Sequence, residues 1–109
     1  MLDINNFGKL EFRIGTIEKA EDSPQAIKAA YKLRINFGSF GKKWSSAQIT
    51  ENYTLEELCG RRILAVMNLG PKKIGPIVSE VLVIGAEDEM GNIVLLEPDN
   101  DIQNGAQAK

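Results

Sequence analysis

The sequence has 109 residues, of which 43% are hydrophobic and 26% charged, and its formal net charge is −2. These values are typical of one globular domain spanning residues 1–109. No apolar run approaches the roughly 18 residues of a membrane span, and the first residues lack the pattern of a secretion signal.

Histidine is absent and Cys59 is the only cysteine. No internal disulfide can form, which favours a cytoplasmic location. No His/Cys zinc site can be assembled either, and the commonest general base is missing. Nucleotide-binding and catalytic motifs are also lacking. We therefore expect a protein that is not an enzyme and that holds no metal and no cofactor.

The chain consists of short alternating segments separated by turn residues, without repeats or a linker. In chain order, we expect strands at residues 10–20, 31–37, 44–50, 62–67 and 78–84, followed by a further short strand at 93–96. Gly15, in the middle of the first segment, predicts a bulge or a sharp bend. The second segment alternates apolar and basic side chains, which predicts a half-buried strand with a basic outer face.

A short helix is expected between the third and fourth strands. Thr54 and Glu57 have the spacing of a capping box, and Gly60 is placed to end the helix in a left-handed conformation. Three strands, a helix and two strands is the order of the OB-fold. The predicted fold is therefore all-β: a five-stranded OB-fold barrel over about residues 10–97, with one short helix and with N- and C-terminal extensions.

Charge is distributed unevenly along the chain. Residues 28–73 carry nine basic and three acidic side chains, whereas residues 80–109 carry seven acidic side chains and one lysine. Such asymmetry suggests a surface that binds a polyanion. The alternative is that the two segments neutralise each other across the sheet.

Several motifs resemble a known family. They are FRIGTIEKAEDSP at residues 12–24, SSAQIT at 45–50, NLGPKKIGPIVSEVLVIG at 68–85 and VLLEPD at 94–99. They are similar to those of the tRNA-binding-domain family, which includes CsaA-like proteins, EMAP II-type cytokines and the C-terminal domain of some methionyl-tRNA synthetases. Ser79-Glu80-Val81-Leu82 favours the CsaA-like branch. The resemblance implies a homodimer that binds tRNA by its shape and phosphates. The alternative that it implies is an export-related chaperone whose partners are unfolded preproteins or secretion components.

The candidate RNA- or peptide-binding residues fall into four groups. Asn68, Lys72 and Lys73 belong to a Gly/Pro-rich segment that is predicted to be an exposed loop, where lysines can meet phosphates. Trp44, Ser46 and Gln48 share one face of a predicted strand, as a base or a peptide would require. Ser79 and Glu80 form the third group, and Arg13, Lys42 and Lys43 widen the basic surface. For each group the alternative is a structural or merely solvated role.

Both ends of the chain carry apolar side chains outside the predicted barrel, namely Leu2, Ile4, Phe7 and Ile102. Asp3 can cap a single helical turn that places Ile4 and Phe7 on one side. Exposed on a monomer, these residues would form an apolar patch. Pairing two chains about a two-fold axis would bury it, so we expect these residues in a homodimer interface.

Overall fold

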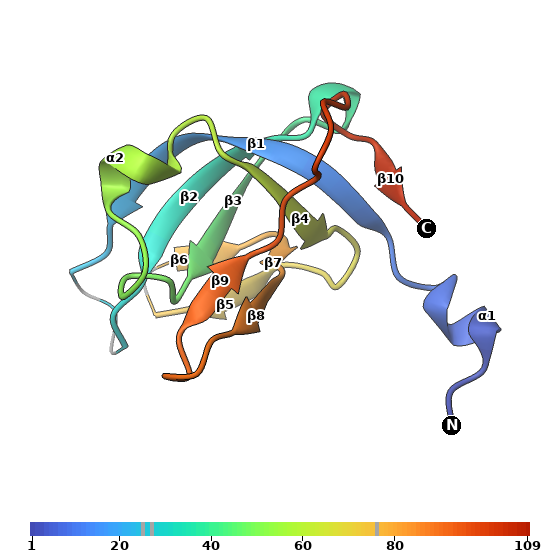
Figure 1. Cartoon of the computed structure of the whole chain (residues 1–109), viewed down its shortest axis with the longest axis horizontal. Helices are drawn as coiled ribbons and strands as arrows, with labels where there is room; N and C mark the ends of the chain where they lie inside the picture. Colours follow the sequence, from blue (N-terminus) through green and yellow to red (C-terminus); the bar gives the residue numbers. More distant parts are fainter. Residues whose placement is uncertain (25, 27, 76) are drawn as a thin grey trace.

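The computed structural model of the chain describes residues 1–24, 26, 28–75 and 77–109. Its elements, in chain order (Figure 1), are α1 (Ile4–Phe7), β1 (Phe12–Asp22), β2 (Tyr31–Asn36), the 3-10 helix η1 (Gly38–Phe40), β3 (Lys42–Ala47), α2 (Leu55–Leu58), β4 (Arg62–Val66), β5 (Lys72–Ile74), β6 (Ile77–Ser79), β7 (Leu82–Val83), β8 (Gly85–Glu87), β9 (Ile93–Leu95) and β10 (Gln107–Ala108).

One antiparallel sheet with the strand order β3-β2-β1-β4-β7 forms the body of the molecule, and β10 pairs with the start of β1. The sheet curls around a core whose residues include the fully buried Ile17, Leu33, Ile35, Phe37 and Ile63. Two hairpins, β5–β6 and β8–β9, complete the barrel. The all-β, OB-like fold predicted from the sequence is confirmed.

Helix α2 lies at one end of the barrel, between β3 and β4 in the chain (Figure 1). Its capping box is present as predicted: the Thr54 hydroxyl accepts from the Glu57 amide, and the Glu57 carboxylate accepts from the Thr54 amide. Leu58 is fully buried. Gly60 has a φ of 90°, so the helix ends in the left-handed conformation predicted from the sequence.

The irregularity of β1 lies three residues beyond the position predicted. Gly15 pairs with Ile63 in an unbroken ladder, and the register with β2 shifts between Ile17 and Lys19 instead. A glycine is required at position 15 for a steric reason, because a Cβ there would lie 2.6 Å from Cγ2 of Ile35 and 2.8 Å from the ring of Phe37. The glycine thus permits close approach of two buried side chains and does not make a bulge.

The predicted strand at residues 78–84 is broken. Ser79 ends β6, Leu82 begins β7, and the chain crosses between them from the edge of β3 to the edge of β4. Lys72 and Lys73, expected in a loop, are part of β5. The lysine-containing segment is therefore one arm of a hairpin whose other arm is β6.

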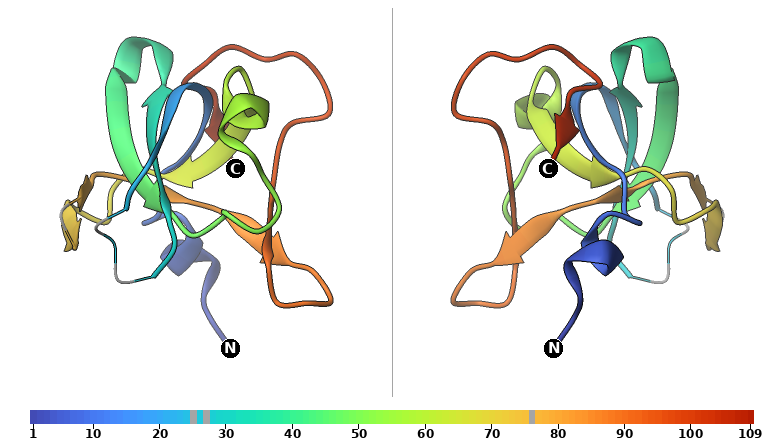
Figure 2. Two further views of the ribbon diagram at one scale, coloured as in Figure 1. Left: turned by 90° about the vertical axis from the view of Figure 1, so that its left-hand side faces the viewer. Right: turned by 90° about the vertical axis from the view of Figure 1, so that its right-hand side faces the viewer.

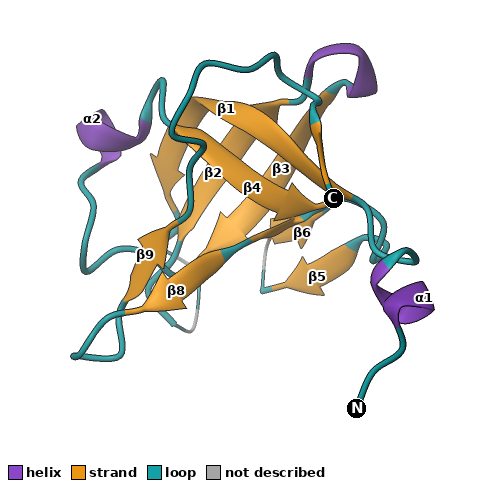
Figure 3. Cartoon of the chain, turned by 45° about the vertical axis from the view of Figure 1, so that its right-hand side comes forward, coloured by secondary structure: helices purple, strands orange, loops and turns teal. Residues whose placement is uncertain are grey.

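The two ends of the chain differ in how they pack against the barrel. Figure 2 shows α1 standing clear of the barrel. Figure 3 shows the loop after β9 crossing the outside of the barrel before β10 joins β1. The C-terminal segment is thus part of the sheet, whereas the N-terminal helix has no buried residue.

Candidate nucleic-acid interface

The outward side chains of β2 and β3 form a surface that is rich in cations. In the antiparallel register, Lys32 lies opposite Ser46, Arg34 opposite Trp44 and Asn36 opposite Lys42. The same rows continue onto β1, where Lys19 is opposite Arg34. Alternate side chains of a strand face opposite ways, so the intervening Leu33, Ile35 and Ser45 are buried. We call the outward set, Lys19, Lys32, Arg34, Lys42, Trp44 and Ser46, the basic face.

Two of the four cations of this face are paired with carboxylates. Lys42 Nζ is 3.1 Å from Glu18 Oε1, and Lys19 Nζ is 2.9 Å from Glu21 Oε1. The contact with Lys19 lowers the pKa of the Glu21 carboxyl, so Glu21 is ionised at neutral pH. Lys32 and Arg34 have no carboxylate partner within the part of the chain that the structure describes. They are the cations of this face that remain available to an anionic ligand.

Trp44 lies beside these two cations. The Lys32 ammonium is 4.5 Å from the centroid of its ring, and the Arg34 guanidinium carbon is 5.9 Å from it. Both distances are within the range of cation–π attraction. The sequence placed Trp44 among the candidate binding residues, but the alternation alone did not reveal which basic side chains would surround it.

Ser79 and Glu80 hold the barrel closed at the edge of β3. The Ser79 hydroxyl accepts from the Ser46 amide at 3.2 Å and donates to the Val81 carbonyl at 3.0 Å. The Glu80 carboxylate accepts from the Trp44 amide at 3.1 Å, and the Glu80 amide donates to the Trp44 carbonyl. These side chains replace part of a backbone ladder, so both have a structural role in the isolated chain.

The two lysines of β5 point to opposite sides of their hairpin. Lys72 is paired with Ser79 and Lys73 with Val78, and neighbouring residues of a strand face opposite ways. Both lysines are exposed. They therefore do not converge on one phosphate group, as two lysines at the tip of a loop could.

Arg13 is committed to contacts within the chain. Its Nη1 donates to the Gly105 carbonyl at 2.7 Å, its Nε donates to Glu11 Oε2 at 2.7 Å, and its guanidinium carbon lies 3.7 Å from the centre of the Phe40 ring. Only 16% of the side chain is exposed. Arg13 thus ties the C-terminal segment to the barrel.

The side chain of Asn68 is also held by hydrogen bonds within the chain. Its amide oxygen accepts from the Glu11 amide at 2.9 Å and its amide nitrogen donates to the Lys9 carbonyl at 2.8 Å. Lys43, at the start of β3, is half-buried and lies opposite Ile35. These two residues and Arg13 are therefore not part of the basic face.

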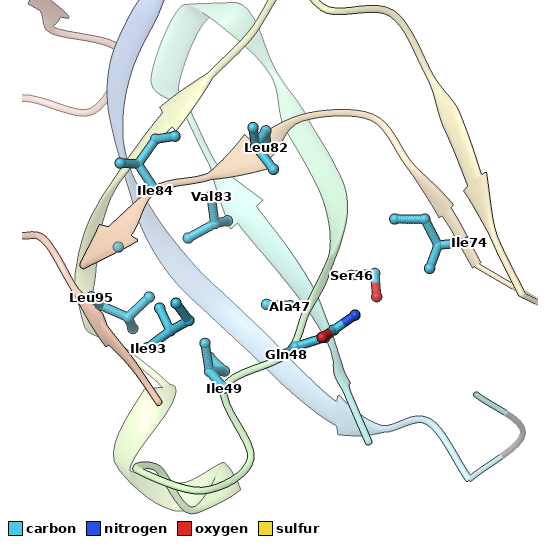
Figure 4. A pocket seen from close by; sticks show the side chains of 11 residues that line it. Ser46, Ala47, Gln48, Ile49, Ile74, Leu82, Val83, Ile84, Ile93 and Leu95 are labelled. Carbon is cyan, nitrogen blue, oxygen red and sulfur yellow. The ribbon is translucent and has the colours of Figure 1, made fainter. Parts of the chain in front are cut away.

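An apolar groove lies beside the basic face (Figure 4). It has a volume of about 330 Å³ and is bordered on one side by Ser46 and Gln48. Two smaller hollows of about 320 and 210 Å³ share Ile74 with it, so we name the whole the Ile74 groove. The aliphatic side chains that line the main hollow are Ala47, Ile49, Ile74, Leu82, Val83, Ile84, Ile93 and Leu95. None of the described residues that line this hollow is charged, so it suits an apolar ligand.

The N-terminal apolar residues are exposed in the isolated chain. Asp3 caps α1, accepting from the Asn5 amide at 3.1 Å. Leu2 is 85% exposed, Ile4 79% and Phe7 47%, while Ile102 in the C-terminal loop is 39% exposed.

Sequence reasoning missed Lys32 and Arg34 as leading candidates, and it missed the aliphatic walls of the groove. The basic residues of β2 were visible in the alternation of residues 31–37, but their proximity to Trp44 depends on the strand register. In the described residues, no group of three or more cysteine, aspartate or glutamate side chains is arranged to hold a metal ion. No helix in the described part of the chain has the length and apolar character needed to cross a membrane.

Comparison with known proteins places this chain in a family. Residues 12–107 match the family described as "Putative tRNA binding domain". The methionine–tRNA ligase of Methanocaldococcus jannaschii is 33% identical over 108 residues, which is 99% of this chain but 16% of that protein. The chain thus spans about one sixth of the length of that curated relative.

Solved structures resemble the chain over its whole length. The chaperone CsaA from Bacillus anthracis superposes with a TM-score of 0.95 at 43% identity, covering 100% of this chain and 99% of that one. The CsaA chaperone protein from Picrophilus torridus gives a TM-score of 0.93 at 45% identity, with complete coverage of both chains. The chain therefore belongs to the tRNA-binding-domain family, and the resemblance recognised in its motifs is confirmed.

Proposed function

We propose that the chain binds tRNA, with the basic face and the lysines of β5 as the main contact surface. The observation that carries this proposal is the pair of cations, Lys32 and Arg34, which have no carboxylate partner among the described residues and lie on the outer face of a domain of this family. Only 6% of the residues are aromatic, so recognition by shape and phosphates is favoured over a platform that stacks several bases.

A filter-binding titration with bulk tRNA tests this function directly. If about four phosphates are neutralised, log K should fall by about three for each tenfold increase in salt. Absence of any retention of tRNA in low salt would rule the proposal out. In this proposal the chain binds tRNA and catalyses no reaction. A cytoplasmic location accords with a tRNA ligand.

The proposal includes a homodimer formed through the N-terminal helix and the C-terminal loop. Leu2, Ile4 and Phe7 leave a largely apolar surface around a shallow hollow, whereas the apolar face of a stable helix is normally covered. A two-fold axis would let the patches of two chains cover each other and would double the basic surface presented to one folded RNA.

A second candidate function is binding of unfolded preproteins or apolar peptide segments, as an export-related chaperone that hands clients to secretion components. The main hollow of the Ile74 groove favours it, because its side chains are mostly aliphatic and Gln48 lies at its border to bond an extended backbone. Two similar solved structures carry the name CsaA chaperone.

Suppression of aggregation of a denatured model protein tests the second function. Leu82→Glu places a charge at the wall of the groove, at a residue that is 49% exposed and therefore tolerant of change. We expect this variant to lose suppression while it keeps tRNA binding. If the wild type fails to suppress aggregation, the chaperone function is excluded and the tRNA function stands unaffected.

A further inference from the structure

The surroundings of Trp44 show how this indole is used. Its backbone is held on both sides of β3: it pairs with Arg34 of β2, its amide donates to the Glu80 carboxylate, and its carbonyl accepts from the Glu80 amide. The backbone of Trp44 at the edge of the sheet is therefore fixed. Lys32 and Arg34 approach the ring from the neighbouring strand, at 4.5 and 5.9 Å from its centroid.

This arrangement disfavours base stacking on the indole. Stacking requires access to a face of the ring, and access is reduced because the Lys32 ammonium lies over the indole and the residue is half-buried. Cation–π attraction also restricts the rotamers of two side chains that are otherwise among the most mobile in proteins. The ring thus reduces the conformational entropy that Lys32 and Arg34 would lose on binding a ligand.

The two cations also form no ion pair with a carboxylate among the described residues. Glu21 lies opposite Lys32 in the register, but its carboxylate is held by Lys19 at 2.9 Å. Lys19 is the main cause of the lowered pKa of the Glu21 carboxyl and the charge of Lys32 contributes less, so Glu21 makes its ion pair with Lys19. Lys32 and Arg34 are two residues apart on one strand and so share a face at a spacing of about 7 Å. This spacing is comparable with the step from one phosphate to the next along a nucleic-acid strand.

We propose that Lys32 and Arg34 bind two successive phosphates of the tRNA backbone and that Trp44 is a positioning residue for both. The inference rests on the proposed tRNA function and identifies the part of the ligand that the basic face contacts. Trp44 itself makes no base contact in this arrangement. Lys32 and Arg34 contribute charge and hydrogen bonds, and Trp44 contributes their orientation.

The experiment compares charge variants with ring variants. Lys32→Gln and Arg34→Gln each remove one phosphate contact, which at roughly 50 mM salt should weaken tRNA binding about tenfold and reduce the salt slope by about 0.7–0.9. Trp44→Leu keeps both charges but removes the ring that orients them, so we expect about a two- to tenfold loss of tRNA affinity with an unchanged salt slope. Trp44→Phe retains an aromatic ring and should restore most of the affinity. Thermal melting of each variant checks that it is folded.

The matched control is Lys109→Gln, which removes one exposed charge beside the start of β1, where Ala108 pairs with Phe12. A direct readout comes from fluorescence, because Trp44 is the only tryptophan of the chain. Binding of tRNA should place phosphates against the two cations beside the ring and so change the Trp44 emission. The same change should be reduced in Lys32→Gln.

The outcomes separate the inference from the function on which it rests. If the wild type retains tRNA but Lys32→Gln and Arg34→Gln behave like Lys109→Gln, the inference is wrong and the tRNA function stands. A loss confined to Trp44→Leu, with both charge variants unaffected, would mean that a base stacks on the indole and would also overturn it. If the wild type retains no tRNA, the function itself fails.

Discussion

Arg13 provides the sharpest test of the distinction between a binding residue and a structural one. Truncation by Arg13→Ala removes the hydrogen bond to the Gly105 carbonyl, the ion pair with Glu11 and the stacking on Phe40. A hydrogen bond from a charged group contributes about 1.5–3 kcal/mol and a cation–π contact about 0.5–2 kcal/mol. The Glu11 side chain is 35% exposed, so its ion pair adds at most about 1 kcal/mol. We expect a destabilisation of about 2–4 kcal/mol.

Urea unfolding at a fixed protein concentration measures this effect. With an m-value of about 1–3 kcal/mol/M, the midpoint should fall on the order of 1–2 M. Arg34→Ala is the control: it removes an exposed arginine with no carboxylate partner in the described chain, and it should alter stability by less than about 1 kcal/mol while weakening tRNA binding. A folded Arg13→Ala protein of unchanged stability that fails to bind tRNA would contradict the structural role derived for Arg13.

Three further predictions concern the packing of the core, the homodimer and the loss of stability at acidic pH. Gly15→Ala inserts a methyl group against fully buried neighbours and should destabilise the protein by about 1–3 kcal/mol, whereas Gly8→Ala, whose Cβ would meet only an atom at 3.6 Å, should be neutral; urea unfolding of both variants tests this. Ile4→Asp combined with Phe7→Asp should yield a monomer of about the 12.0 kDa chain mass with weaker tRNA binding, and light scattering that shows a 12.0 kDa wild type at micromolar concentration would refute the dimer. The pKa of Asp88 is lowered, chiefly by the hydrogen bond from the Asn52 side chain, so the stability that Asp88 contributes is present above its ordinary pKa of 3.8 and is lost as the pH falls through its lower folded value. The melting temperature of Asp88→Asn should therefore fall less than that of the wild type over this acidic range. If the two melting temperatures change in parallel with pH, the stabilising role of Asp88 is contradicted.

Local patterns predicted the parts of this fold that depend on local physics. The capping box at Thr54, the cap at Asp3 and the alternation of β2 all follow from neighbours within a few residues, and all three are present. The motifs of the family extended this to the barrel as a whole. Strand ends differ from their predicted positions by a few residues, because the partner strand and not the sequence determines where a ladder stops.

The candidate site was harder to predict because its properties depend on register. Arg13 and Arg34 are both arginines on strands with alternating patterns, yet one is tied to Gly105, 92 residues later in the chain, and the other faces solvent. The sequence placed Ser79 and Glu80 among the candidate binding residues, but their partners on β3 could be recognised only from the three-dimensional contacts. The main hollow of the Ile74 groove combines residues from four separate stretches of the chain, so no single stretch of sequence signals it.

The closure of the barrel at the edge of β3 makes the fold unusually dependent on two side chains. A ladder of backbone hydrogen bonds accepts almost any sequence, because every residue except proline carries the same donor and acceptor. Here the Ser46 and Trp44 amides are satisfied by the hydroxyl of Ser79 and the carboxylate of Glu80, which other residues cannot supply equally. Retention of these two residues among relatives would therefore report a constraint of folding rather than a shared ligand. An engineered chain could exchange the ligand-facing residues of the basic face while leaving this pair untouched.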